Sequence, residues 1–125
     1  MSDPNIARLG TLEAKNQRFR CTNTDPLLLL SAPFANTAKI NSLYITNSNA
    51  CTQHTAIKLY INNGAVTDTS DNYHLAKNIV VPLKTTIILI DRESVVYLEP
   101  NQYLWIVDEL GGSIEGVINY DMMKE

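Results

Sequence analysis

The alternation of short apolar segments with turn-forming residues constrains the fold of this chain more than any other feature. Segments rich in Ile, Val and Thr recur along the sequence, and Asn, Asp, Gly or Pro interrupts them at intervals of about 8–14 residues. β-Branched side chains have few rotamers and pack well on a pleated surface, and the chain holds 12 Ile, 7 Val and 11 Thr. This spacing is typical of an antiparallel sandwich or barrel and not of alternating strands and helices.

The pattern predicts about eight to ten strands. They are expected at residues 17–21, 27–30, 40–46, 55–61, 73–75, 79–81, 85–90, 95–98, 103–107 and 113–120. Turns are expected at residues 62–64, 91–94 and 99–102, where Asn, Asp, Gly or Pro cluster. The polar end, residues 121–125, is expected to fray. The predicted fold class is all-β: an antiparallel two-sheet sandwich, jelly-roll-like, with an extended N-terminal arm.

The predicted domain organisation is an arm at residues 1–16 and a single β-sandwich domain at residues 17–125. The arm is assigned because its apolar residues are scattered and show no clear period. A chain of 125 residues can bury enough surface to hold a core without disulfides or a structural metal.

The charge of the chain narrows its expected partners. The net charge is −3, which argues against a protein that binds nucleic acid by neutralising phosphates. The distribution is uneven, with +3 over residues 1–90 and −6 over residues 91–125. A basic N-terminal part and an acidic C-terminal part suggest complementary surfaces that steer assembly, although charges distant in sequence can mix in space. We find no apolar run long enough for a transmembrane helix and no signal-peptide pattern, so no membrane association is expected.

The sequence shows no constellation that indicates catalysis. His54 and His74 lack ligand-spaced partners, and the carboxylates that lie close in sequence fall in predicted turns. Nucleophile-elbow, dinucleotide-binding and P-loop motifs are absent from the sequence. The chain is therefore expected not to be an enzyme, with no catalytic, cofactor-binding or metal-binding residues. Cys21 and Cys51 are expected to be reduced thiols, and a disulfide between them stays open if their strands are neighbours.

Two aromatic residues offer an alternative function. Tyr103 and Trp105 share one face of a predicted strand and could form a platform for a sugar ring. The strand is apolar, however, and packing in a core is the more frequent use of such residues.

Several segments together resemble small virion proteins of tailed bacteriophages, as found in marine and cyanobacterial phages. The similar segments are residues 7–12 (ARLGTL), 32–38 (APFANTA), 40–47 (INSLYITN), 73–82 (YHLAKNIVVP) and 98–106 (LEPNQYLWI). The resemblance covers about residues 7–120 and is a pattern of strands and turns. The chain departs from the pattern in its longer polar loop at 62–72 and in its last residues, 122–125.

This resemblance implies a non-enzymatic structural subunit located in the virion and made in the cytoplasm of the host bacterium. The specific expectation is a capsid decoration (cement) protein that binds other virion proteins, the major capsid protein first, as a homo-oligomer and preferably a trimer. The alternatives are a neck or tail connector ring, a tail-fibre-associated protein, or a receptor- or carbohydrate-binding module. Expected interaction residues are those of the arm and first strand, together with the two aromatics: Arg8, Leu9, Leu12, Arg18, Arg20, Tyr103 and Trp105.

Overall fold

The structure is a computed structural model that describes residues 11–33, 35–48, 54–64, 71–110 and 114–124. All the regular elements in these residues are strands, which confirms the predicted all-β fold. In chain order they are β1 (Thr11–Cys21), β2 (Leu27–Ser31), β3 (Asn36–Asn47), β4 (Thr55–Asn62), β5 (Tyr73–Val81), β6 (Thr86–Ile90), β7 (Val96–Leu98), β8 (Tyr103–Asp108) and β9 (Ile114–Lys124). Within the described part there is no helix that could span a membrane.

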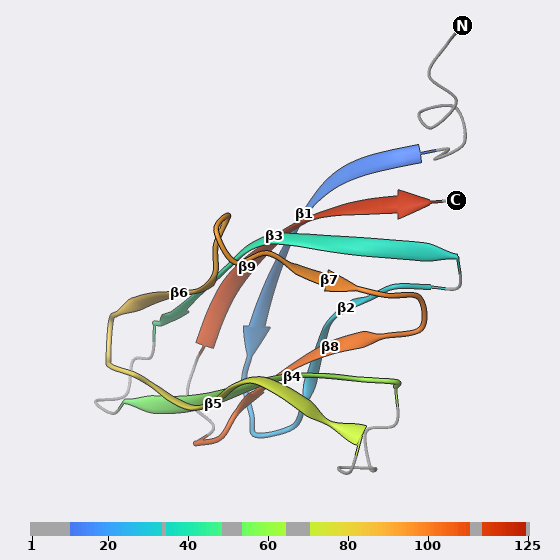
Figure 1. The fold of residues 1–125 in the computed structure, drawn as a ribbon. Coiled ribbons are helices and arrows are strands. Elements are labelled where there is room, and N and C mark those ends of the chain that lie inside the picture. The colour runs from blue at the N-terminus through green and yellow to red at the C-terminus, as the bar shows by residue number, and fades with distance from the viewer. Residues whose placement is uncertain (1–10, 34, 49–53, 65–70, 111–113, 125) are drawn as a thin grey trace, which may run out of the picture.

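The strands form two antiparallel sheets that pack face to face as the two layers of a sandwich (Figure 1). The first sheet has the order β1-β9-β3-β6, and β7 pairs with β3 beyond the end of β6. The second sheet has the order β2-β8-β4-β5. The first and last strands are thus neighbours in one sheet, and this pairing places Thr11 beside Lys124.

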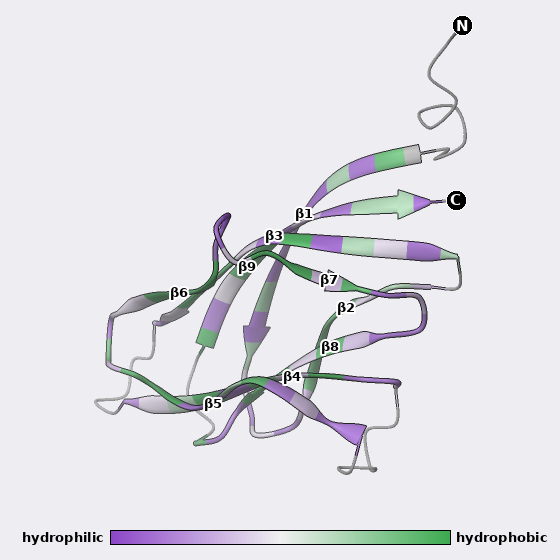
Figure 2. Cartoon of the chain, viewed as in Figure 1, coloured by the Kyte–Doolittle hydropathy of each residue, from purple (hydrophilic) through white to green (hydrophobic). Residues whose placement is uncertain are grey.

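The core lies between the sheets and is built by the alternation of side chains along each strand. In β3, for example, Ala38, Ile40, Leu43 and Ile45 are fully buried, and a bulge between Ile40 and Ser42 adjusts the phase. Hydrophobic and hydrophilic residues alternate along β1, β3 and β9, whereas the loop between β6 and β7 is hydrophilic (Figure 2). Ile57 and Leu59 of β4 and Ile114 and Ile118 of β9 are likewise buried in the core.

Both ends of the chain depart from the expected boundaries. Residues 11–16, expected in the arm, form the first half of β1, and residues 121–124, expected to fray, belong to β9. These segments are held by backbone pairing, since Thr11 lies opposite Lys124 in β9 and Lys124 also lies opposite Asn36 in β3. Hydrophobic periodicity does not reveal residues 12–16, because their side chains are mostly exposed and their strand structure rests on main-chain hydrogen bonds. In β9 the buried Met122 continues the alternation of the strand, although it stands among polar residues in the sequence. Residues 1–10 of the arm lie outside the described residues.

One further difference concerns continuity, whereas a predicted turn is confirmed. The predicted strands at 73–75 and 79–81 form one strand, β5, which bends at Asn78 where φ is 57°. Asn tolerates this left-handed conformation, so a kink replaces the expected break. The turn at Gly64 is confirmed: φ is 106° there, and its N–H donates to Asn62 Oδ1 at 2.8 Å.

Candidate functional site

The structure divides the predicted interaction residues between the two sheets. Leu12, Arg18 and Arg20 lie on β1, at the edge of the first sheet, and all three side chains are exposed. Tyr103 and Trp105 lie on β8 in the second sheet. Arg8 and Leu9 lie outside the described residues. The residues predicted together therefore do not form one site.

The first sheet has an outer face, the side directed away from the second sheet, on which three cross-strand rows run from β1 towards β6. The first row is Arg20, Glu115, Thr46 and Thr86. Arg20 forms an ion pair with Glu115 at 2.8 Å, and the Thr46 and Thr86 hydroxyl groups share a hydrogen bond of 2.7 Å. This row satisfies its own polar groups.

The third row is also internally paired. Asn16 Nδ2 donates to Asn119 Oδ1 at 2.6 Å, and Asn119 Nδ2 donates to Ser42 Oγ at 2.7 Å. A nearby amide, Asn41 Nδ2, donates to Asp121 Oδ2 at 3.2 Å. These contacts join β1, β9 and β3 and leave few polar groups free for a ligand.

The central row, between these two, is different. It consists of Arg18, Val117, Tyr44 and Ile88, which lie opposite one another on β1, β9, β3 and β6. Tyr44 is 39% exposed and Ile88 is 57% exposed. Arg18 makes no ion pair with any described residue. The central row is therefore an apolar stripe with a free guanidinium group at one end.

Two shallow hollows flank the central row and share Tyr44 as a wall. One, of about 630 Å³, lies over Val117 and is bounded by Arg18 and Arg20. The other, of about 820 Å³, lies between β3 and the loop that follows β6, with Asp91, Arg92 and Glu93 in its lining. That loop is rigid: Asp91 Oδ1 accepts hydrogen bonds from the backbone N–H groups of Glu93 and Ser94, at 3.0 and 3.1 Å.

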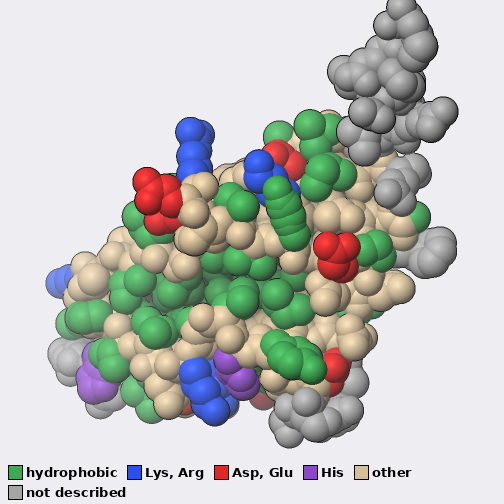
Figure 3. Space-filling view, viewed as in Figure 1, with side chains coloured by type: hydrophobic (Ala, Val, Ile, Leu, Met, Phe, Trp, Pro, Cys, Tyr) green, Lys and Arg blue, Asp and Glu red, His purple; other side chains and the backbone are tan. Residues whose placement is uncertain are grey.

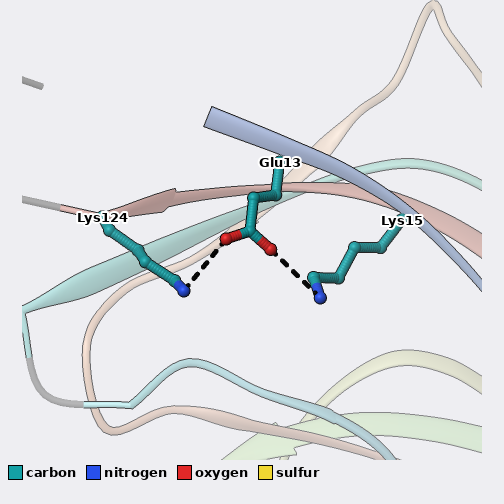
Figure 4. A network of polar contacts seen from close by, with 3 residues as sticks. All are labelled: Glu13, Lys15 and Lys124. Carbon is teal, nitrogen blue, oxygen red and sulfur yellow. Dashed lines mark hydrogen bonds and ion pairs between the residues drawn. The ribbon is translucent and has the colours of Figure 1, made fainter. Parts of the chain in front are cut away.

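A small ionic network fixes the end of β1 to the end of β9. Glu13 Oε1 lies 3.0 Å from Lys124 Nζ, and Glu13 Oε2 lies 3.1 Å from Lys15 Nζ (Figure 4). Hydrogen bonds and attraction from Lys124 and Lys15 lower the pKa of the Glu13 carboxyl below its usual 4.5. The network links β1 to β9, because Glu13 and Lys15 lie on β1 and Lys124 lies on β9.

The aromatic pair on β8, Tyr103 and Trp105, packs against other side chains of the second sheet. Trp105 is only 9% exposed and packs with Tyr60 and Val107, with Tyr103 against them. Its indole N–H donates to Asn62 Oδ1 at 2.8 Å. Tyr103 and Trp105 share a face as expected, but little of the indole is left for a sugar ring.

A buried polar cluster lies at one end of the sandwich. Asp108 is fully buried; its Oδ1 accepts from the Thr55 hydroxyl and, at 3.3 Å, from the Leu110 N–H. Its Oδ2 has no hydrogen-bond partner. Burial, and to a smaller extent the charge of Asp108, raise the pKa of the Cys21 thiol to about 11. A thiol with so high a pKa is a poor nucleophile at neutral pH. Cys51 lies outside the described residues.

The histidines lie apart in the fold. His54 is exposed just before β4, and His74 on β5 has its ring centroid 5.5 Å from that of Tyr60. Partial burial and the charges of Lys77 and Lys58 lower the pKa of His74. The described residues contain no group of three or more His, Cys, Asp or Glu that could hold a metal ion.

The sequence reading missed Tyr44, Val117 and Ile88. The period of two does place Tyr44 on the opposite face from Leu43 and Ile45, so its exposure could have been found. That these three residues line up with Arg18 could not, because the register of four strands far apart in sequence comes only from the pairing.

Comparison with known proteins gives one family. Residues 6–91 match the PITH domain, which is more than half of the chain. No curated protein matches the sequence.

Two solved structures, both of one virus, are similar in fold. One is the structure of the infectious bursal disease virus Gt strain, with a TM-score of 0.42, 12% identity, and 90% of this chain and 32% of that chain covered. The other is a mutant VP2 protein of the same virus from derived T=1 particles, with a TM-score of 0.34, 10% identity and coverages of 92% and 40%. This chain thus spans about a third of the length of the first.

Proposed function

The chain belongs to the PITH domain family, and we propose that it acts by binding other protein chains in an assembly and not by catalysis. The observation that carries the proposal is the apolar surface left open by the sandwich. Large apolar side chains are exposed on both sheets, among them Tyr44, Ile88, Tyr97, Leu75 and Val80. Apolar atoms also form a band across the side of the molecule where β6 and β7 face β5 (Figure 3). Contiguous apolar patches on a small protein mark sites where other proteins bind.

The proposed assembly is a virus particle, and the specific role is that of a capsid decoration protein. The resemblance of residues 7–120 to small tailed-phage virion proteins supports this role. The partners would be the major capsid protein and further copies of the chain, preferably in trimers. A neck or tail ring and a tail-fibre attachment are the alternatives within the same class.

The absence of catalysis is part of the proposal. The proposal is supported by the contacts of the described acidic groups. Glu13 and Glu115 form ion pairs, and Asp91 accepts hydrogen bonds that cap a turn. Cys21 and Asp108 are buried. Of these side chains Glu115 and Asp91 line a hollow, and each is already engaged in the contact just named.

Mass spectrometry of purified particles from the source of the sequence tests the virion role. The chain is expected among the particle proteins, with hundreds of copies for a decoration protein or a single ring's worth for a connector. Absence from the particles would refute the virion role.

A deletion tests the contribution of the arm. Removing residues 1–16 would destroy half of β1, so the deletion should stop at residue 10. The shortened chain should fold as before, judged by circular dichroism, and should be incorporated into particles less well. Equal incorporation would show that the arm does not dock.

A further inference from the structure

The central row is self-complementary along its length. Arg18 stands at the β1 end, Val117 and Tyr44 occupy the middle, and Ile88 stands at the β6 end. The hollow next to Ile88 is lined by two carboxylates, Asp91 and Glu93, and two cations, Arg92 and Lys39. The side chain of Glu93, like that of Arg18, makes no ion pair with a described residue. The stripe therefore has the unpaired Arg18 at one end, apolar residues in the middle and, at the other end, the unpaired carboxylate of Glu93 within a group of mixed charges.

A twofold axis that lies in the interface, parallel to the sheet and roughly along its strands, would bring two outer faces together with the opposite ends of their stripes in contact. With the axis near Val117 and Tyr44, Arg18 of one copy would face Glu93 of the other, and the reverse contact would form at the same time. The apolar residues of both copies would meet at the centre. Strands lie about 4.8 Å apart, so β1 and β6 are roughly 14 Å from each other, which is a separation that a single interface can span.

The flanking rows favour the same arrangement. Because many polar groups of the first and third rows bond to one another, covering these rows leaves fewer donors and acceptors without a partner. The loop after β6 rises from the sheet (Figure 1), whereas β1 is a free edge strand, so the loop of one copy can lie beyond the β1 edge of the other. Aligned packing of two sheets is a common arrangement.

We propose that the outer face of the first sheet binds a second copy of this chain in a twofold, isologous contact, with Arg18 paired to Glu93 across the interface. The partner in this contact is a second copy of the chain. The biological role of the contact rests on the assembly function proposed above. It does not depend on a virion, because it concerns the purified chain. A twofold contact of this kind can also link larger rings to one another.

Charge reversal tests the contact, with the molar mass of the purified full chain measured by light scattering over a range of concentrations. The wild type should approach twice the mass of the chain. Arg18→Glu and Glu93→Lys should each weaken dimerisation roughly tenfold or more, because each places two like-charged pairs in the interface. The double variant R18E/E93K should dimerise again, and an equimolar mixture of the two single variants should form a heterodimer.

Two further variants separate this face from the rest of the surface. Ile88→Lys should abolish dimerisation, whereas Lys77→Glu and Tyr73→Lys, which alter exposed residues of β5 in the other sheet, should leave it unchanged. Circular dichroism confirms that each variant is folded. A monomeric wild type, an unaffected I88K variant, or a double variant weaker than both single variants would overturn the proposal. Failure of the virion test with a persistent, charge-dependent dimer would refute the assembly role and leave this contact standing.

Discussion

At the scale of single residues, the buried polar groups distinguish this sandwich from a purely apolar one. Asp108 and Thr55 are enclosed where β8 ends and β4 begins, and one carboxylate oxygen of Asp108 has no partner. A buried carboxylate depends strongly on the donors that it retains. Local stability at this end of the sandwich therefore rests on few hydrogen bonds.

Replacing Thr55 with Val should destabilise the fold by about 1–3 kcal/mol, because the Asp108 carboxylate loses its hydroxyl donor without regaining water. Urea denaturation gives the change in the free energy of unfolding. Thr86→Val is the matched control: its hydroxyl bonds to Thr46 on the exposed face, and the expected change is within about 0.5 kcal/mol. Equal losses for the two variants would contradict this account of Asp108.

At the scale of elements, β1 is the strand whose attachment most needs explanation. It is an edge strand with mostly exposed side chains, and edge strands with inward or flanking charges resist unwanted pairing. Its attachment to β9 combines main-chain pairing along the whole strand with two local devices, the packing of Phe19 over Gly116 and the Glu13 network. Each device can be removed separately.

Gly116→Ala should destabilise the protein by about 1–3 kcal/mol, since a Cβ at this position would overlap the Phe19 ring and the Tyr44 carbonyl oxygen. Thermal or urea unfolding measures the loss. Combining it with Phe19→Ala should cost less than the sum of the two single changes, because the ring that clashes is gone. Strictly additive losses would mean that the ring does not limit the site.

Glu13 should make the stability of the β1–β9 pair dependent on pH. Its pKa is lower in the folded protein than its usual 4.5, so its contribution is present above that pH and is lost as the pH falls through the folded value. Glu13→Gln should therefore lower the melting temperature slightly at neutral pH and not at acidic pH. The effect should be small and should shrink in high salt, since the group is exposed. Equal melting-temperature differences at both pH values would contradict it.

At the scale of the whole molecule, the pairing of the first strand with the last determines how the chain must fold. The sheet β1-β9-β3-β6 cannot form until residues more than a hundred positions apart, such as Thr11 and Lys124, have met. Folding of such topologies is slow, because the entropy of closing long loops is lost before the contacts form.

Refolding should accordingly take milliseconds to seconds. Stopped-flow fluorescence can follow it, since Trp105 is the single tryptophan and becomes buried against Tyr60. Refolding within microseconds would indicate that local contacts dominate the transition state, contrary to the topology.

The sequence was sufficient for the fold class and for the positions of the central strands, because burial there imposes a period of two, as in much of β3 and β4. It was insufficient for the first half of β1, where main-chain pairing and not burial maintains the strand, and for the end of β9, where the buried Met122 stands among polar residues. The candidate surface was only half predictable. Arg18 was identified from its charge, but its alignment with Val117, Tyr44 and Ile88 depends on register, which no local pattern encodes.

The neighbouring ends of the chain also have a mechanical consequence. Thr11 lies opposite Lys124 in an antiparallel pair, so a force that pulls these two residues apart acts along the hydrogen bonds and breaks them one after another. Tension between Thr11 and Ile114, at opposite ends of the same pair, would instead load all the bonds in parallel as shear. The domain should therefore unfold at a low force when it is pulled at Thr11 and Lys124, and only at a higher force when it is pulled at Thr11 and Ile114.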